Sequence, residues 1–180
     1  MAESKSKGYP KKVIPVTVAG VRMEMPSNTP IVLLQEQSGD RYIPIWVGAV
    51  EATAIAYAQQ GIVPPRPLTH DLFLDALTTL GSTVTGVRIT ELTDGVFYAI
   101  IDLTGPDGQL HEISARPSDA IAIALRAQAP ISADELILDE AGVNIPLEPG
   151  TDSEGESEDQ VEKFREFLEG ISPEDFEELP

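Results

Sequence analysis

Two short stretches of the sequence place an arginine and a proline just before a hydroxyl residue and an aspartate. They are RPLTHD at 66–71 and RPSD at 116–119, and each stands before a segment with a helical pattern. A guanidinium beside the free N–H groups of a helix N-terminus makes a suitable site for a phosphate or a carboxylate. If the fold brings the two helix starts together, Arg66 and Arg116 would form two halves of one anion site.

The same residue types also have structural explanations. Thr69 and Ser118 are suitable N-caps, because a hydroxyl oxygen accepts an N–H from the first helical turn. Asp71 and Asp119 would then lie in first turns, where the helix dipole favours negative charge. We therefore predict two helices that are capped by these hydroxyl groups.

Capping does not explain the arginines, and two interpretations of them remain open. In the first, both guanidiniums bind a substrate phosphate. In the second, Arg66 and Arg116 form structural ion pairs with Asp71, Asp119 or Glu51.

His70 is the single residue most suited to acid–base chemistry. A helix N-terminus disfavours the imidazolium, which leaves a neutral ring able to accept a proton. With carboxylates at Glu51, Asp71 and Asp119, a hydrolytic site with Mg²⁺ or Mn²⁺ is chemically reasonable. Neighbouring helical residues point about 100° apart, so His70 and Asp71 cannot share a ligand geometry unaided. His111 lies in a predicted strand with no acidic motif around it, and we interpret it as structural.

Composition limits the classes of protein. The chain has 180 residues, 42% of them apolar, which suits one domain with a real core. The absence of cysteine excludes disulfides, thiolate zinc sites and a cysteine nucleophile. No apolar run approaches the ~18 residues that span a bilayer, and the first twelve residues lack the apolar middle of a signal peptide. We expect a cytoplasmic protein that does not contact membrane.

The negative charge is unevenly distributed along the chain. The formal net charge is −18, of which residues 1–12 contribute +3, residues 13–133 contribute −6 and residues 134–180 contribute −15. A protein that binds nucleic acid usually has a basic surface, so this distribution disfavours such a partner.

The pattern of strands and helices occurs twice. Three strand-like segments and an alanine-rich helix fill 13–61, and the same order returns in 82–129. Both copies contain Gly-Val-Arg, at 20–22 and at 86–88. We predict an α+β fold: a duplicated β-β-β-α unit whose mostly antiparallel sheet or sheets wrap around helices in a compact single domain. Chance similarity of two alanine-rich helices is the alternative.

The remaining segments complete the predicted organisation. A linking helix is expected over 69–81, and a short helix or edge element over 130–143. The domain would run from 13 to 143, with a flexible N-terminus at 1–12 and an acidic linker at 144–160. An amphipathic helix at 161–180 would pack against its own domain, a second subunit or another protein.

The stretch from about 16 to 142 resembles the bifunctional nuclease domain family. The similarity is carried by PIWVGAVEATAIAYAQQGIVPPRPLTHDLFLDAL (44–77), LTDGVFYAIIDL (92–103) and ARPSDAIAIALRAQAPI (115–131). The resemblance implies a self-associating α+β domain, a homodimer or higher homo-oligomer, with nuclease activity on RNA and DNA. Many relatives have an acid at the position of Ser114, so a metal held by that acid would be weakened here.

The candidate residues follow from both arguments. The candidate catalytic residues are Glu51, His70, Asp71 and Asp119, and the candidate substrate-binding residues are Arg66, Thr69, Arg116 and Ser118. The first functional hypothesis is metal-assisted hydrolysis of phosphodiesters in RNA or DNA. The alternative is a non-catalytic dimeric module for regulation or interaction. A third hypothesis makes the acidic tail an inhibitor that replaces phosphate at the arginines.

Overall fold

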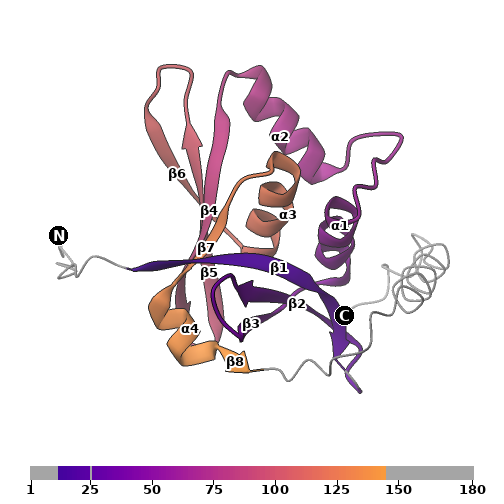
Figure 1. Cartoon of the computed structure of the whole chain (residues 1–180). Coiled ribbons are helices and arrows are strands. Elements are labelled where there is room, and N and C mark those ends of the chain that lie inside the picture. Colours follow the sequence, from indigo (N-terminus) through magenta and orange to yellow (C-terminus); the bar gives the residue numbers. More distant parts are fainter. Residues whose placement is uncertain (1–11, 25, 145–180) are drawn as a thin grey trace, which may run out of the picture. The chain divides into compact units, whose positions relative to one another are not determined.

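The computed structural model describes residues 12–24 and 26–144, which form an α+β unit built on one eight-stranded sheet (Figure 1). Its strands are β1 (Val13–Glu24), β2 (Thr29–Glu36), β3 (Arg41–Trp46), β4 (Thr83–Thr93), β5 (Val96–Thr104), β6 (Leu110–Ala115), β7 (Ile131–Asp134) and β8 (Val143–Asn144). Its helices are α1 (Ala49–Gln59), α2 (Thr69–Thr79), α3 (Pro117–Ala127) and α4 (Glu135–Ala141). None of these helices is long and apolar enough to cross a membrane. The expectations for the acidic linker and the C-terminal helix lie outside the described residues.

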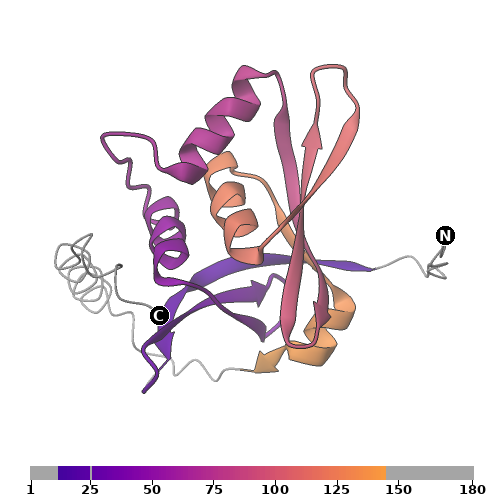
Figure 2. The same ribbon diagram turned by 180° about the vertical axis from the view of Figure 1, so that it is seen from behind.

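The sheet has a three-stranded half on one side of β7 and a half of three strands plus the two-residue strand β8 on the other. Its order is β6-β5-β4-β7-β1-β2-β3-β8, and every neighbouring pair is antiparallel except β4 and β7. The halves run in clearly different directions when viewed from either side (Figures 1 and 2). β1 pairs with β2, and β4 with β5, in registers that each shift at a glycine, Gly20 and Gly86. This arrangement is what a duplicated unit would give, and the duplication itself stays a prediction.

The segment 130–143 differs from its predicted form. It contains both a strand and a helix, and the strand lies in the middle of the sheet rather than at an edge. β7 pairs with β1 through Ile131 and Ala133, and with β4 through the same two residues. A four-residue strand buried on both sides is too short for a periodic pattern, so its central place could not be read from the sequence.

The helix α3 forms the centre of the core. Five consecutive residues from Ala120 to Ala124 are buried, so α3 is covered on nearly every side. Three of these five are alanines, whose small side chains allow neighbouring backbones to approach closely. α3 packs against α1, α2, β4 and β5, and therefore brings the two halves of the sequence together.

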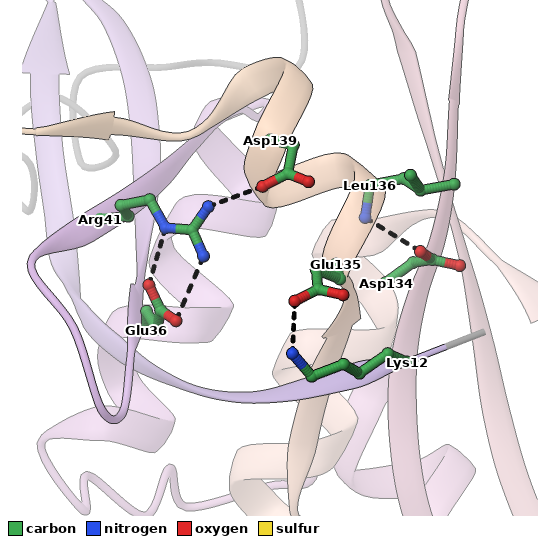
Figure 3. A network of polar contacts seen from close by, with 7 residues as sticks. All are labelled: Lys12, Glu36, Arg41, Asp134, Glu135, Leu136 and Asp139. Atoms are coloured by element: carbon green, nitrogen blue, oxygen red, sulfur yellow. Dashed lines mark hydrogen bonds and ion pairs between the residues drawn. The ribbon is translucent and has the colours of Figure 1, made fainter. Parts of the chain in front are cut away.

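The helix α4 lies apart from the other three and packs against β3, β4 and β7 (Figure 1). Asp134 caps it by accepting the N–H of Leu136. Arg41 bridges Glu36 and Asp139, and Lys12 pairs with Glu135, so polar contacts tie the helix to β1, β2 and β3 (Figure 3).

The predicted hydroxyl caps are wrong. The N-cap of α2 is Leu68, and the N-cap of α3 is Arg116, so Thr69 and Ser118 both lie inside the first turn. Proline is favoured at the first helical position because its fixed φ suits the helix and its missing N–H costs nothing there. Pro117 occupies that position in α3, which moves the cap back to Arg116.

We expect the buried face of α3 to carry much of the stability. Ile121 is fully buried, and Ile121→Ala should lower the free energy of unfolding by about 2–5 kcal/mol through lost burial and a residual cavity. Val63 is 88% exposed, and Val63→Ala should change it by less than ~0.5 kcal/mol. Urea denaturation of both variants measures the difference, and equal losses would contradict a central α3.

Candidate functional site

The starts of α1 and α3 are joined by one guanidinium. Arg116 donates from Nε to Asp119 Oδ2 at 2.7 Å and from Nη2 to Asp119 Oδ1 at 3.1 Å. The same Nη2 lies 2.9 Å from Glu51 Oε1, in the first turn of α1. The Arg116 side chain is 66% exposed, while the carboxylates of Glu51 and Asp119 are 19% and 29% exposed. The structural ion pair considered for Arg116 is therefore present, and its guanidinium still faces solvent.

His70 joins this group from α2. Its Nε2 lies 3.1 Å from Oδ1 of Asp119, and its side chain is only 13% exposed. Burial raises the pKa of Asp119, but the hydrogen bonds and charge of Arg116 and the hydrogen bond of His70 outweigh it, so the pKa is lowered overall. Asp119 is therefore an ionised acceptor at neutral pH, and Nε2 of His70 must be the donor. In the neutral ring the lone pair then belongs to Nδ1, which is the nitrogen able to accept a proton.

His70, Arg116 and Asp119 border an open depression between α2, α3 and the β5–β6 pair, and Glu51 lies outside its lining. Its volume is about 500 Å³, within the ~300–1,000 Å³ typical of small-molecule sites. Its lining residues are Thr69, His70, Phe73, Ile101, Ile113, Ser114, Ala115, Arg116, Asp119 and Ile123. A hydrophobic floor with a polar rim is therefore built from three separate parts of the chain.

A second arginine, Arg126, joins the helices α1, α2 and α3 to one another. Its Nε pairs with Asp71 of α2, and its Nη1 donates to the carbonyls of Ala54 in α1 and Ala122 in α3. Its side chain is 9% exposed. The sequence analysis missed Arg126, although a charge within the apolar run AIAIALRAQ (120–128) is a signal that could have found it.

Asp71 therefore connects α2 to α3 through Arg126 and takes no part in the contact between His70 and Asp119. Burial raises the pKa of Asp71, but hydrogen bonds from Arg126 and from the N–H of Leu68, with the Arg126 charge, lower it overall. Because Asp71 directly follows His70 in α2, the Asp71–Arg126 pair anchors the turn that carries His70.

The predicted residues divide into two groups. The structure brings together Glu51, His70, Arg116 and Asp119, whereas Arg66 is exposed and makes no ion pair with another described residue. Thr69 lies on the rim of the depression, and Ser118 is buried within the first turn of α3. His111 is exposed on β6 and does not line the depression. The second guanidinium close to these helices is thus Arg126, not Arg66.

The donors at this site do not fit a preformed divalent-cation centre. Mg²⁺ and Mn²⁺ need several oxygen or nitrogen donors aimed at one point. Within 12–24 and 26–144, no group of three His, Asp or Glu side chains is so arranged. Glu51 and Asp119 already share Arg116, so a cation would have to compete with the guanidinium. The residues present therefore give no reason to place a metal here, and a requirement for Mg²⁺ or Mn²⁺ stays a prediction.

Comparisons with known proteins identify the family. The model of the bifunctional nuclease domain matches residues 32–146, more than half of the chain and all four clustered residues. An uncharacterized protein of Mycobacterium tuberculosis (strain H37Rv) is 51% identical over 89% of this chain and 96% of its own length. The chain belongs to the bifunctional nuclease domain family.

Plant relatives are more distant. A protein of Oryza minuta described as a bifunctional nuclease is 29% identical over 75% of this chain and 41% of its own length. Bifunctional nuclease 2 of Arabidopsis thaliana is 26% identical over 66% of this chain and 36% of its own length. The similarity thus covers less than half of these plant proteins.

We expect Asp71→Asn to reduce the free energy of unfolding at pH 7 by about 1.5–3 kcal/mol, because Arg126 loses its charged partner. Because the pKa of Asp71 is lowered in the folded state, its contribution to the free energy of unfolding is fully present above the ordinary carboxyl pKa of ~3.9. That contribution disappears as the pH falls through the folded-state value. Urea denaturation at pH 7 and in acid should therefore show the difference between wild type and Asp71→Asn shrinking in acid.

Asp75 provides the matched control, since it is an exposed acid one turn further along α2. Asp75→Asn should change stability by less than ~0.5 kcal/mol at either pH. A loss for Asp75→Asn as large as that for Asp71→Asn would show that the Arg126 pair has no special role.

Proposed function

We propose that this protein hydrolyses phosphodiester bonds of RNA and DNA at the depression between α2, α3 and β6. The observation that carries the proposal is the convergence of His70, Asp119, Arg116 and Glu51 beside an open depression. Membership of the bifunctional nuclease domain family and the printed names of the plant relatives support phosphodiesters as the substrate.

The roles follow from the hydrogen bonds. Asp119 orients the ring of His70, whose Nδ1 accepts the proton of an attacking water. The water oxygen bonds to phosphorus, the bond from phosphorus to the leaving oxygen breaks, and the leaving oxygen takes a proton from solvent. Arg116, two-thirds exposed, is the cation able to balance the charge that develops on the phosphoryl oxygens. Glu51 holds the guanidinium in place.

The alternative function also rests on an observation. Both carboxylates already pair with the single guanidinium of Arg116, which is what a structural brace in a non-catalytic interaction module would show. The net negative charge of the chain points the same way, since it disfavours long contacts with phosphate backbones. Assays of single variants distinguish the two functions.

We expect His70→Gln to lower kcat on labelled RNA and DNA by about 100-fold or more, the usual contribution of a general base. The control is His111→Gln, which changes the other histidine, exposed on β6 outside the depression. Reactions with Mg²⁺, with Mn²⁺ and with EDTA also test the metal requirement. Equal cleavage by wild type and His70→Gln would show that a contaminant cleaves the substrate. The non-catalytic interaction module would then be the remaining function.

We expect Arg116→Ala to lower kcat/KM by about 100-fold, because the phosphate loses its cation and faces two carboxylates that no longer have their guanidinium partner. Arg116→Lys should recover only part of this loss, since an ammonium cannot reproduce the two-pronged contact with Asp119. The control is Arg22→Ala, an exposed arginine of β1 that makes no ion pair with another described residue. Steady-state kinetics on a fluorogenic oligonucleotide measure all three, and an unchanged Arg116→Ala would remove this residue from the site.

A further inference from the structure

The floor of the depression is hydrophobic and is formed by residues from four elements. Ile101 and Ile113 are paired across β5 and β6, and Ile123 of α3 and Phe73 of α2 complete the floor. Ile101 and Ile123 are 2% and 4% exposed, so they form the bottom rather than the margin. Hydrolysis of a phosphodiester does not need such a floor, since phosphate binds to cations and N–H groups.

The rim above this floor carries polar groups that are able to contact a ligand. Arg116 and the His70–Asp119 pair lie on it, and Thr69 of α2 lies beside them. Thr69 is exposed, and its side chain makes no hydrogen bond with another described residue. A flat hydrophobic ring with polar edges would bury one face on the floor and place an edge near this hydroxyl.

From this arrangement we infer that the depression binds one unpaired nucleobase of single-stranded nucleic acid, with the neighbouring phosphate at Arg116. The inference rests on the proposed function and specifies its substrate class. A base within a duplex is stacked on both faces and cannot reach the floor. An unpaired base avoids most of the cost of unpairing and unstacking, so single strands are the substrates that enter this site most readily.

The charge of the protein supports the same occupant. With −6 over residues 13–133 and a single arginine lining the depression, contacts to many phosphates are disfavoured. Binding must then come mostly from the base and from one phosphate. The logarithm of the affinity should fall with the logarithm of salt concentration at a slope near −0.7, the value of about one phosphate contact on a single strand.

The test measures fluorescence anisotropy of the full chain with a fluorescein-labelled phosphorothioate octanucleotide, which resists cleavage. The same strand in a blunt duplex and an octamer of abasic sugar–phosphates are the comparison probes. We expect both comparison probes to bind at least tenfold more weakly than the single strand, because stacking of a base on protein groups supplies that much affinity. Equal binding of the single strand and the abasic octamer would overturn the inference.

Two variants locate the base without deleting the core. Thr69→Trp adds a ring over the depression from an exposed position in the first turn of α2 and should abolish the preference for bases. Phe73→Leu keeps a hydrophobic side chain but removes the aromatic face, and should weaken binding of the single strand several-fold. Phe97→Leu is the matched control, because Phe97 packs against the core without lining the depression. Melting temperatures close to wild type show that the variants fold, and a preference retained by Thr69→Trp would place the base elsewhere.

The result is separable from the outcome for hydrolysis. Cleavage of single strands and duplexes at equal rates, with no effect of Thr69→Trp, would rule out the base site and leave the nuclease activity standing. Base-dependent binding without any cleavage by wild type would rule out the nuclease activity and leave the base site standing.

Discussion

The burial of α3 against α1, α2, β4 and β5 is the constraint on which the rest of the described structure depends. Small residues on this helix allow α1 and α2 to pack against it, and the three helices then present their N-terminal ends within contact distance. A buried arginine of α3, Arg126, uses that closeness to bind a carboxylate of α2 and carbonyls of α1 and α3. The convergence of Glu51, His70 and Asp119 is therefore a consequence of core packing.

The chemistry of the site depends on how one carboxylate is shared. Asp119 accepts hydrogen bonds from Arg116 and His70 at once, which keeps it ionised and fixes which imidazole nitrogen carries the proton. Arg116 in turn lies between Asp119 and Glu51, so its guanidinium offsets one of these two carboxylate charges in a chain that is strongly acidic as a whole. A single phosphate is compatible with such a site, and a long polyanionic surface is not.

Much of this arrangement follows from sequence patterns, and its failures have physical causes. Period-two alternation and alanine-rich segments predict the outer strands and α1 to α3 closely, and the second arginine–proline stretch does mark part of the cluster. The pattern cannot show that β7 inserts between β4 and β1, because strands that pair across about 44 residues of chain, as β7 and β4 do, or across about 120, as β7 and β1 do, leave no local signal. It also cannot distinguish Arg66, which is exposed, from Arg126, which is buried, since that difference depends on tertiary packing. The hydroxyl caps fail because a proline at the first helical position determines where α3 begins.

The measurement closest to the central claim is a long-range ¹H–¹⁵N NMR spectrum of the His70 ring in the intact protein at a pH where the ring is neutral. The account predicts a single tautomer with the proton on Nε2 and a free lone pair on Nδ1, held by Asp119, and averaging of the two tautomers in Asp119→Asn. A wild-type ring that averages its tautomers like a free imidazole, or carries its proton on Nδ1, would contradict an oriented base at this site.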